Sequence, residues 1–394
     1  MPSCVIIVEN LPVPFDRRVW QEAKALRGAG WEVSVICPTS KQHPQTHETL
    51  DGIVIYRHSL PMEARYKLGF LFEYSAALFH EARLLLKIAL TRGFDIIQIC
   101  NPPDLLFINA LPYKLFGKRL VFDHHDVCPE LFAVKFGHKV LLHRFLLFAE
   151  MLTMKTADIV ISANETFRNI AIGRCGKSPQ DVITVYSIPD PAYVKRQLPN
   201  QELRKGARVV LGYIGIISDQ DGVDHLVRMM HHLVNDHGCR EIGAVIVGDG
   251  PALPEVRQLA SDLHLAEQIT FTGYLRGDDL LAALSTFDIG IIPDPVNEYN
   301  DKISMNKVFE YSAFGVPAVA YDLSETRRLL GTTAEYADDA TPAGLARACL
   351  RLINDDHARA EHGRAAKALA DEHFDWMREQ AKYVAAYQRL MRVK

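Results

Sequence analysis

No stretch of about 20 consecutive apolar residues occurs in the 394-residue chain, so the sequence predicts no membrane-spanning helix. The opening residues, MPSCVIIVEN, contain no basic segment, and their apolar run is too short for a signal peptide. The 7 cysteines are scattered and form no C-x-x-C pair, which is typical of buried thiols in a reducing compartment. We therefore expect a cytoplasmic protein.

Several cofactor and catalytic motifs are also absent. The loop after residues 4–9 has no glycine before Gly28, so it cannot form the G-x-G-x-x-G turn that holds a dinucleotide. There is no P-loop and no G-x-S-x-G nucleophile elbow. The histidines at 124–125 and 231–237 lack the spacing of a zinc or iron site. A dinucleotide-dependent oxidoreductase is thereby disfavoured, and we expect no bound metal.

The composition is that of an ordinary soluble globular protein, with 48% apolar and 23% charged residues. The net charge is −4, from 44 basic and 48 acidic residues, which argues against a nucleic-acid-binding protein. The length predicts two domains, each with its own core.

Short apolar runs alternate with longer helical patterns, as in a doubly wound α/β fold with parallel sheets. The candidate strands are residues 4–9, 32–37, 52–57, 95–100, 119–123, 158–163 and 182–186, and after a gap 208–215, 243–250, 268–273, 288–294 and 317–322. The gap, residues 187–206, carries three prolines and clustered charge, which predicts a linker. We expect one Rossmann-like domain at 1–190 and a second at 205–377. The C-terminal helix, about 378–394, would pack back on the first domain.

Ligands of open α/β sheets bind at the carboxyl ends of the strands, and two such domains would face a central cleft. Three strand-end loops stand out, residues 123–130 (DHHDVCPE), 213–226 and 271–275. Adjacent His and Asp residues in the first loop suggest a site, and the alternative interpretation is a capped loop with Asp123 or Asp126 as a helix N-cap. The glycine turns of the other two loops can approach a phosphate, although each alone also fits a plain connection.

The most informative segment is residues 301–322, DKISMNKVFEYSAFGVPAVAYD. Ser304 is a predicted N-cap and Gly315 a predicted C-terminal glycine of a short helix. Lys307 and Glu310 lie on its polar side, where a helix N-terminus, a cation and a carboxylate can hold a phosphate and a sugar hydroxyl. Taken alone, the segment favours an amphipathic helix with a solvated Lys307–Glu310 pair.

In this order, the segments FDRRVWQEAKALRGAGWEVSVICP, DHHDVCPE, ADIVISANETFRNI, YIGIISDQDGVDHL, VGDGP, ITFTGYL and NKVFEYSAFGVPAVA resemble one protein family. The chain resembles the retaining glycosyltransferases of the GT-B fold in the large family 4 group, and especially bacterial enzymes that build surface polysaccharides. The resemblance covers nearly the whole chain.

The resemblance implies a role for particular residues. Glu310 would accept hydrogen bonds from the ribose of a nucleoside-diphosphate sugar, and His125 would face the donor sugar. The remaining implied contacts are Tyr274 and Leu275 at the base, Gly215 and Gly248 at the diphosphate, and Arg17, Arg18 and Asp126 at the acceptor. For the two arginines, a solvated helical turn or a structural ion pair is an equally good interpretation.

The chain departs from the family where many relatives carry an Arg and a Lys that clamp the diphosphate. Here Ile216 or Ile217 and Asp221 occupy those places, and Lys302 stands where many relatives have a second glutamate. Our hypothesis is that Lys302, Lys307 and the helix N-terminus at Ser304 replace the clamp, and we expect Asn306 to be a further donor contact.

The implied activity is transfer of a hexosyl or N-acetylaminosugar group, from a UDP-sugar, to a glycan or a polyprenyl-diphosphate-linked acceptor with retention of configuration. The resemblance implies no cofactor and no required metal. A sugar-nucleotide epimerase or hydrolase, and a non-catalytic nucleotide-sugar-binding protein, remain open alternatives. Residues 61–93 and 133–155 mix Phe and Leu with basic residues, and 133–148 is the better candidate for peripheral contact with an anionic membrane at the inner face of the plasma membrane.

Overall fold

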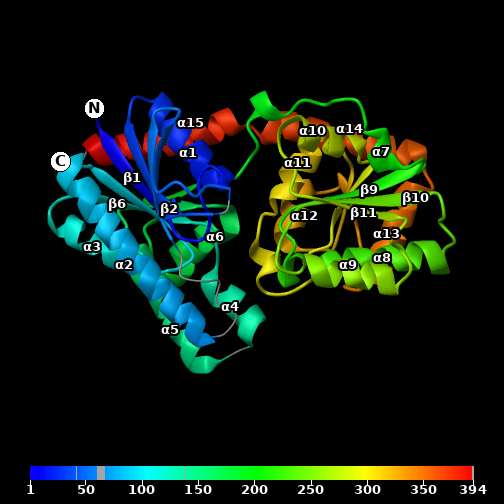
Figure 1. The fold of residues 1–394 in the computed structure, drawn as a ribbon, viewed down its shortest axis with the longest axis horizontal. Coiled ribbons are helices and arrows are strands. Elements are labelled where there is room, and N and C mark those ends of the chain that lie inside the picture. The colour runs from blue at the N-terminus through cyan, green and yellow to red at the C-terminus, as the bar shows by residue number, and fades with distance from the viewer. Residues whose placement is uncertain (41, 60–66, 138, 393–394) are drawn as a thin grey trace. The chain divides into compact units, whose positions relative to one another are not determined.

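The computed structural model describes residues 1–40, 42–59, 67–137 and 139–392, and the side chains of residues 67–74 are outside the described part. The chain forms two compact units (Figure 1). One comprises Met1–Ser187 and Met377–Lys394, and the other Ile188–Trp376. We refer to them as unit 1 and unit 2.

Unit 1 is built on a sheet with the strand order β3-β4-β2-β1-β5-β6-β7-β8. The strands are β1 (Ser3–Val8), β2 (Glu32–Pro38), β3 (His47–Leu50), β4 (Ile53–His58), β5 (Ile96–Cys100), β6 (Arg119–His124), β7 (Ile159–Ser162) and β8 (Val182–Thr184). All neighbours pair in parallel except β3, which pairs antiparallel with β4 at the edge. The strand order reverses between β1 and β5, which is where a doubly wound sheet opens to ligands.

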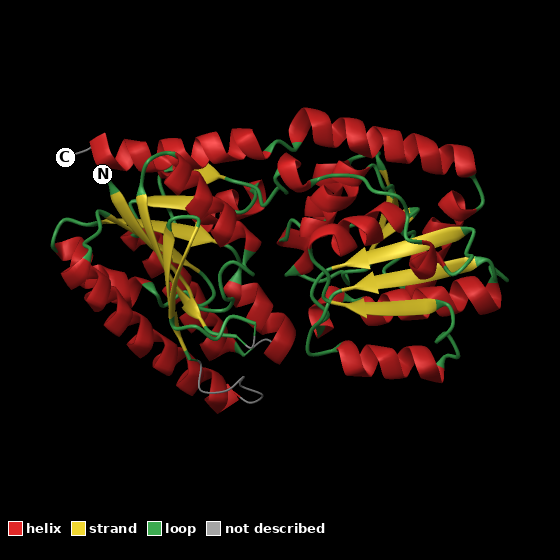
Figure 2. Cartoon of the chain, turned by 45° about the horizontal axis from the view of Figure 1, so that its top comes forward, coloured by secondary structure: helices red, strands yellow, loops and turns green. Residues whose placement is uncertain are grey.

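Helices cover both faces of this sheet (Figure 2). They are α1 (Arg17–Gly28), α2 (Lys67–Thr91), α3 (Phe107–Leu115), α4 (Cys128–Phe136), α5 (Val140–Thr156), α6 (Glu165–Asn169) and α15 (Trp376–Arg392). The first starts where Asp16 accepts a hydrogen bond from the backbone N–H of Val19, as an N-cap does. The strands between the helices are almost fully buried, which explains their continuous apolar sequence.

Unit 2 contains a parallel sheet with the order β11-β10-β9-β12-β13-β14. Its strands are β9 (Val209–Ile214), β10 (Ile242–Val247), β11 (Ile269–Gly273), β12 (Ile289–Ile292), β13 (Ala318–Ala320) and β14 (Ala334–Tyr336). Its helices are α7 (Gln201–Arg204), α8 (Val223–His231), α9 (Leu253–Asp262), α10 (Gly277–Thr286), α11 (Asn306–Phe314), α12 (Ser324–Leu330), α13 (Pro342–Ile353) and α14 (Asp356–His373). The order reverses between β9 and β12, so a ligand is expected at the carboxyl ends of these strands. In each unit, we call the loops at the carboxyl ends of the strands around the reversal the ligand edge.

The predicted linker, residues 187–206, is partly packed on unit 2. The backbone N–H groups of Gln197 and Asn200 donate to the hydroxyls of Ser285 and Thr286 on α10, at 2.9 and 2.7 Å. Arg204 forms an ion pair with Asp288 at 2.8 Å. The second half of the segment therefore belongs to unit 2, because its polar groups find their partners there.

No described helix is both long enough and apolar enough to cross a membrane. The membrane-surface prediction for residues 61–93 falls in part on residues 61–66, which lie outside the described residues.

Candidate functional site

At the ligand edge of unit 1, His125 follows directly after β6. Its backbone N–H donates to Asn101 Oδ1 at 2.7 Å, and its ring Nε2 lies 2.6 Å from Asp123 Oδ2. Asn101 is fully buried and also donates to the backbone carbonyl of Asp126 at 2.6 Å. The loop is therefore held in one conformation by an amide that follows β5, a residue that the sequence reasoning did not select.

Neither Asp123 nor Asp126 is a helix N-cap, since α4 begins after Val127 without a side-chain cap. Asp126 is half-buried beside the loop. The neighbouring His124 has a different role, because it is completely buried between Phe122 and Phe167. Burial lowers the pKa of His124 to about 3, so it stays neutral. Of the two adjacent histidines, only His125 is placed to meet a ligand.

The Arg18 side chain forms hydrogen bonds and ion pairs with other residues of unit 1. Its guanidinium forms two hydrogen bonds with the Asp123 carboxylate, at 2.7 and 3.1 Å, and donates to the Val185 carbonyl at 2.7 Å. It also lies 3.3 Å from Glu22 Oε1. This geometry favours the structural ion pair over an acceptor contact, whereas Arg17 is exposed at the start of α1.

Burial alone would raise the pKa of Asp123, but Arg18 and His125 hold it well below its ordinary value. The carboxylate is therefore ionised and accepts a hydrogen bond from His125 Nε2–H, which leaves Nδ1 as the ring nitrogen without an Asp123 contact.

The side chains of Cys100, Asp123 and His125 offer ligand atoms within 4.8 Å of one another. The donor set fits a cation poorly, because the Arg18 guanidinium already occupies both Asp123 oxygens and would repel a metal ion. Burial also raises the pKa of the Cys100 thiol, which disfavours the thiolate that a metal requires. We assign no metal to these residues.

At the ligand edge of unit 2, the loops after β9, β10 and β11 are joined by backbone hydrogen bonds. Gly215 N–H donates to Val247 at 3.1 Å, and Gly248 N–H donates to Gly273 at 3.0 Å. A Cβ atom at Gly248 would lie 1.8 Å from the Gly215 carbonyl oxygen, so only glycine permits this contact. The two predicted diphosphate glycines are thus brought together, and the exposed Tyr274 follows Gly273.

The polar side of α11 is buried and not solvated, which corrects the simplest prediction for this helix. Lys307 and Glu310 are each only 6% exposed. Lys307 Nζ lies 2.9 and 2.7 Å from the two carboxylate oxygens of Asp294, which follows β12 and is 1% exposed. It also lies 5.1 Å from the ring centroid of Tyr213. Asp294 is a second residue that the sequence reasoning missed.

The prediction that Ser304 caps this helix is wrong. The helix begins at Asn306 with Met305 as its N-cap residue, and the Ser304 hydroxyl donates to Glu325 Oε2 at 3.3 Å. The predicted end is confirmed, since Gly315 has the left-handed φ of 60° directly after Phe314.

The predicted cation at 302 has a backbone partner in the preceding segment. Lys302 Nζ donates to the carbonyl of Glu298 at 3.0 Å, and Asn306 is exposed. Leu275 is half-buried after Tyr274. The structure therefore places Lys307, Glu310 and Asn306 on one helix, and it directs Ser304 and Lys302 to other partners.

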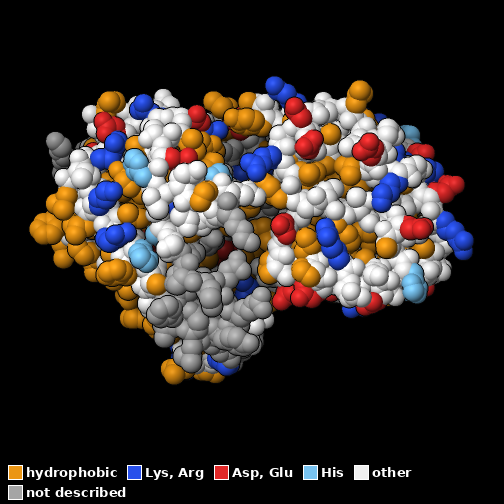
Figure 3. All heavy atoms as spheres, viewed as in Figure 1, with side chains coloured by type: hydrophobic (Ala, Val, Ile, Leu, Met, Phe, Trp, Pro, Cys, Tyr) orange, Lys and Arg blue, Asp and Glu red, His pale blue; other side chains and the backbone are white. Residues whose placement is uncertain are grey.

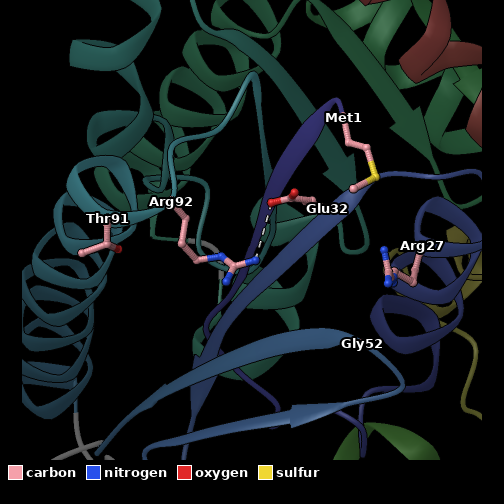
Figure 4. Close-up of a pocket in the computed structure, with 6 residues that line it drawn as sticks. All are labelled: Met1, Arg27, Glu32, Gly52, Thr91 and Arg92. Atoms are coloured by element: carbon pink, nitrogen blue, oxygen red, sulfur yellow. Dashed lines mark ion pairs between the residues drawn. The ribbon is translucent and has the colours of Figure 1, made fainter.

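A separate cavity of about 520 Å³ lies at the other end of the unit 1 strands, where they begin (Figure 4). Its lining includes Arg27, Glu32, Gly52 and Arg92, near the amino ends of β2 and β4. Arg92 and Glu32 lie 3.7 Å apart. Because ligands of such sheets bind at the carboxyl ends of the strands, we do not assign the functional site to this cavity.

Both halves of the chain match known family models. Residues 16–192 match the model described as Glycosyltransferase Family 4, and residues 208–355 match the model described as Glycosyl transferases group 1.

Curated relatives cover part of the chain. A 2-deoxystreptamine glucosyltransferase of Streptomyces kanamyceticus is 25% identical over 240 residues, 58% of this chain and 60% of the relative. A GDP-mannose-dependent alpha-(1-6)-phosphatidylinositol monomannoside mannosyltransferase of Mycobacterium tuberculosis is 34% identical over 146 residues, 36% of each chain. In both alignments the chain spans less than two thirds of the relative's length.

Solved structures match over the full length. Sucrose-phosphate synthase of Thermosynechococcus elongatus has a TM-score of 0.81 at 14% identity, with 100% of both chains covered. Anabaena HepE in complex with UDP and glucose has a TM-score of 0.73 at 16% identity, covering 99% of this chain and 100% of that one. The predicted GT-B fold with two Rossmann-like units is confirmed.

Proposed function

Since this chain belongs to the glycosyltransferases of family 4 and group 1, we propose that it transfers a sugar from a nucleoside-diphosphate donor to an acceptor hydroxyl. The observation that carries the proposal is the ligand edge of unit 2. There Lys307 and Glu310 are buried on α11, while Gly215 and Gly248 bring neighbouring backbone loops together. A charged helix start beside glycine loops at a strand reversal suits a nucleotide diphosphate.

In this proposal Glu310 accepts hydrogen bonds from the ribose hydroxyls, and the backbone at Tyr274 and Leu275 borders the base. The loops of Gly215 and Gly248 approach the diphosphate. The Ser304 hydroxyl has another partner, so it is not part of the proposed phosphate clamp. The clamp would consist of Lys307, Lys302 and the first backbone N–H groups of α11.

Lys307 can serve a phosphate while paired with Asp294. An ammonium group has three N–H donors, and the two carboxylate contacts account for two of them. Asp294 thus fixes the direction of the ammonium before the donor binds, so little side-chain entropy is lost on binding. The positive charge stabilises the nucleoside diphosphate as it departs.

We further propose a UDP-sugar as donor, a hexose or N-acetylamino sugar as the transferred group, and retention of configuration. His125, fixed by Asp123 and Asn101, would contact the donor sugar and would not attack it. The reaction would require no metal, because Lys307 and the helix start supply the positive potential.

The acceptor is proposed to be a glycan or a lipid-linked glycan used at the cell surface, which would make contact with an anionic membrane useful. On α5, Val140, Leu141, Phe145 and Phe148 are between 51% and 84% exposed. The exposed Lys139 and Arg144 lie among them. Figure 3 shows further hydrophobic side chains over α2 and α3. An apolar helix face flanked by basic residues suits a membrane surface.

Release of nucleoside diphosphate tests the proposal. The protein would be incubated with UDP-glucose and UDP-N-acetylglucosamine, with and without a polyprenyl-diphosphate-linked saccharide. A glycosyltransferase releases UDP only when a suitable acceptor is present. Release of UDP without acceptor would support a hydrolase, and rearrangement of the donor without acceptor would support an epimerase. Donor binding without turnover would support a nucleotide-sugar-binding protein.

A further inference from the structure

A fully buried glutamine lies in the middle of the unit 1 sheet. Gln98 is on β5, between β1 and β6, and is 0% exposed. Its neighbours on the strand are apolar, so a side-chain amide here requires partners for its oxygen and its nitrogen. Both ends of the amide have such partners, and they come from distant parts of the chain.

The amide oxygen meets the C-terminal helix α15. The hydroxyl of Tyr383 donates to Gln98 Oε1 at 2.7 Å, and the hydroxyl of Tyr387 donates to the same oxygen. Both tyrosines are completely buried, and the Tyr387 ring packs edge-on against Trp31. Two hydroxyl donors at one carbonyl oxygen fix the direction of the amide, since a flipped amide would place its N–H groups against them.

The amide nitrogen faces the carboxyl groups of Glu22 and Asp123, behind the candidate site. Gln98 Nε2 lies 2.7 Å from Glu22 Oε2 and 3.4 Å from Asp123 Oδ2. The same Asp123 oxygen lies 2.6 Å from His125 Nε2. A continuous hydrogen-bonded chain therefore runs from the α15 tyrosines through Gln98 and Asp123 to the histidine.

We propose that Gln98, Tyr383 and Tyr387 are positioning residues for His125, and that α15 thereby determines which imidazole nitrogen carries the proton and which one faces the ligand edge. None of the three reaches the ligand edge itself. They act through Asp123, whose second oxygen is held by Arg18. The effect on catalysis rests on the proposed function, whereas the effect on the imidazole does not.

The physical reason is the polarity of the amide. With the tyrosines in place, the amide presents N–H to Asp123, and the carboxylate remains an acceptor for His125 Nε2. Burial beside Asp123 raises the pKa of Glu22, so the charged partner is Asp123. Without the hydroxyls, the amide can rotate and present its oxygen to this ionised carboxylate. The repulsion between the amide oxygen and Asp123 would then be relieved in one of two ways. Either Asp123 moves, or the proton of His125 shifts from one ring nitrogen to the other.

Two variants test this inference, each with a spectroscopic readout. Tyr383→Phe with Tyr387→Phe keeps both rings and removes both hydroxyls, and Gln98→Met keeps the side-chain length and removes the amide. The matched control is Tyr56→Phe, a buried tyrosine of the same unit that packs on His47. Long-range ¹⁵N–¹H correlation of the imidazoles reports which ring nitrogen carries the proton, and the His125 signals are assigned from their loss in His125→Asn.

We expect the wild type and Tyr56→Phe to show His125 protonated at Nε2. The double tyrosine variant and Gln98→Met should change or broaden the His125 signals while the other histidine signals persist, which shows that the fold is intact. With an active donor and acceptor pair, kcat should fall about tenfold with little change in KM for the donor. Unchanged His125 signals in both folded variants would overturn the proposal, even if turnover falls. Altered signals in a protein without transferase activity would uphold the positioning role and contradict only the proposed function.

Discussion

At the residue scale, the most consequential contact is the buried pair of Lys307 and Asp294. Removing one member of such a pair leaves an uncompensated charge in the core, which costs more than replacing both members with neutral groups. The pair therefore has two separable effects, one on stability and one on phosphate binding.

We predict that Asp294→Ala lowers the free energy of unfolding by about 3–5 kcal/mol, because it leaves the Lys307 ammonium buried without its counter-ion. The double variant Asp294→Asn with Lys307→Met should be destabilised less and should fail to bind a donor. Urea unfolding and donor-induced thermal shifts measure the two effects. Full donor binding by the folded double variant would contradict the clamp.

Asp104, which follows β5 in unit 1, gives a pH-dependent prediction. Burial, with the nearby Glu150 carboxylate, raises the pKa of Asp104 to about 8. The folded state thus holds a proton that the unfolded state releases above its ordinary pKa of 3.8, and stability falls as pH rises from there towards 8.

We predict that Asp104→Asn removes this slope, because an amide cannot ionise and still accepts the hydrogen bond from Asn101. The free energy of unfolding of the variant, compared with that of the wild type, should be higher at pH 8 than at pH 5. We expect a difference of about 1.4 kcal/mol or more, which corresponds to a pKa difference of one unit between the folded and unfolded states. Urea unfolding at the two pH values checks it, with the exposed Asp51→Asn as control. An equal difference at both pH values would contradict the assignment.

At the element scale, α11 shows which local signals in the sequence hold. Its end was predictable, because the left-handed residue after a helix is a property of the backbone. Its start was not, because the Ser304 hydroxyl has a stronger partner in Glu325, which is buried and comes from α12. A tertiary contact thus overrides the local preference of serine for a cap.

We predict that Ser304→Ala costs about 0.5–1.5 kcal/mol, the net value of its hydrogen bond to the buried Glu325. Gly315→Ala should cost about 1–3 kcal/mol, because alanine is strained at φ 60° and its Cβ would lie 3.3 Å from the Gly363 carbonyl oxygen. Thermal unfolding of the two variants compares these effects directly. Unchanged stability in Ser304→Ala would show that the hydrogen bond to Glu325 contributes little.

The exposed face of α5 is the element that would meet a membrane. We predict that the wild type sediments with vesicles of anionic lipid at low salt, and that Leu141→Ser with Phe145→Ser reduces this binding about tenfold or more, since each buried apolar side chain contributes about 1.5–3 kcal/mol. Leu198→Ser, equally exposed in unit 2, is the control. No sedimentation of the wild type would contradict the membrane proposal.

At the scale of the whole molecule, ligand binding by unit 2 should stabilise the native protein. We predict that one nucleotide base stands out in a thermal-shift panel of UDP-, GDP- and ADP-sugars, with UDP-sugars the most effective. A donor at about a hundredfold excess over its dissociation constant adds about 2.7 kcal/mol to the free energy of unfolding. Glu310→Ala should abolish the response. A larger response to GDP-sugars would show that the donor is a GDP-sugar and not a UDP-sugar. No response to any of the donors would contradict the proposed site.

The alternation of apolar runs was sufficient to predict nearly every strand of both sheets. The two strands that it missed, β3 and β14, lack that signal. The residues of β3 are half-buried or exposed at a sheet edge. Strand β14 lies at the edge of the other sheet, and two of its three residues are half-buried. Edge strands are stabilised mainly by their neighbour, so their own sequence carries little indication of them.

The sequence alone determined the architecture and the strand-end loops, because periodicity, glycine and proline act over a few residues. The candidate ligands came from the resemblance to a known family. Only the tertiary structure decided which polar side chains work together. It buried Lys307 against Asp294, directed Ser304 to Glu325, and bound Arg18 to Asp123. It also joined Gln98 to tyrosines 285 and 289 positions away. A buried polar group needs a hydrogen-bond partner, because an unpaired one costs free energy in the core. The local sequence does not indicate which distant residue will be that partner.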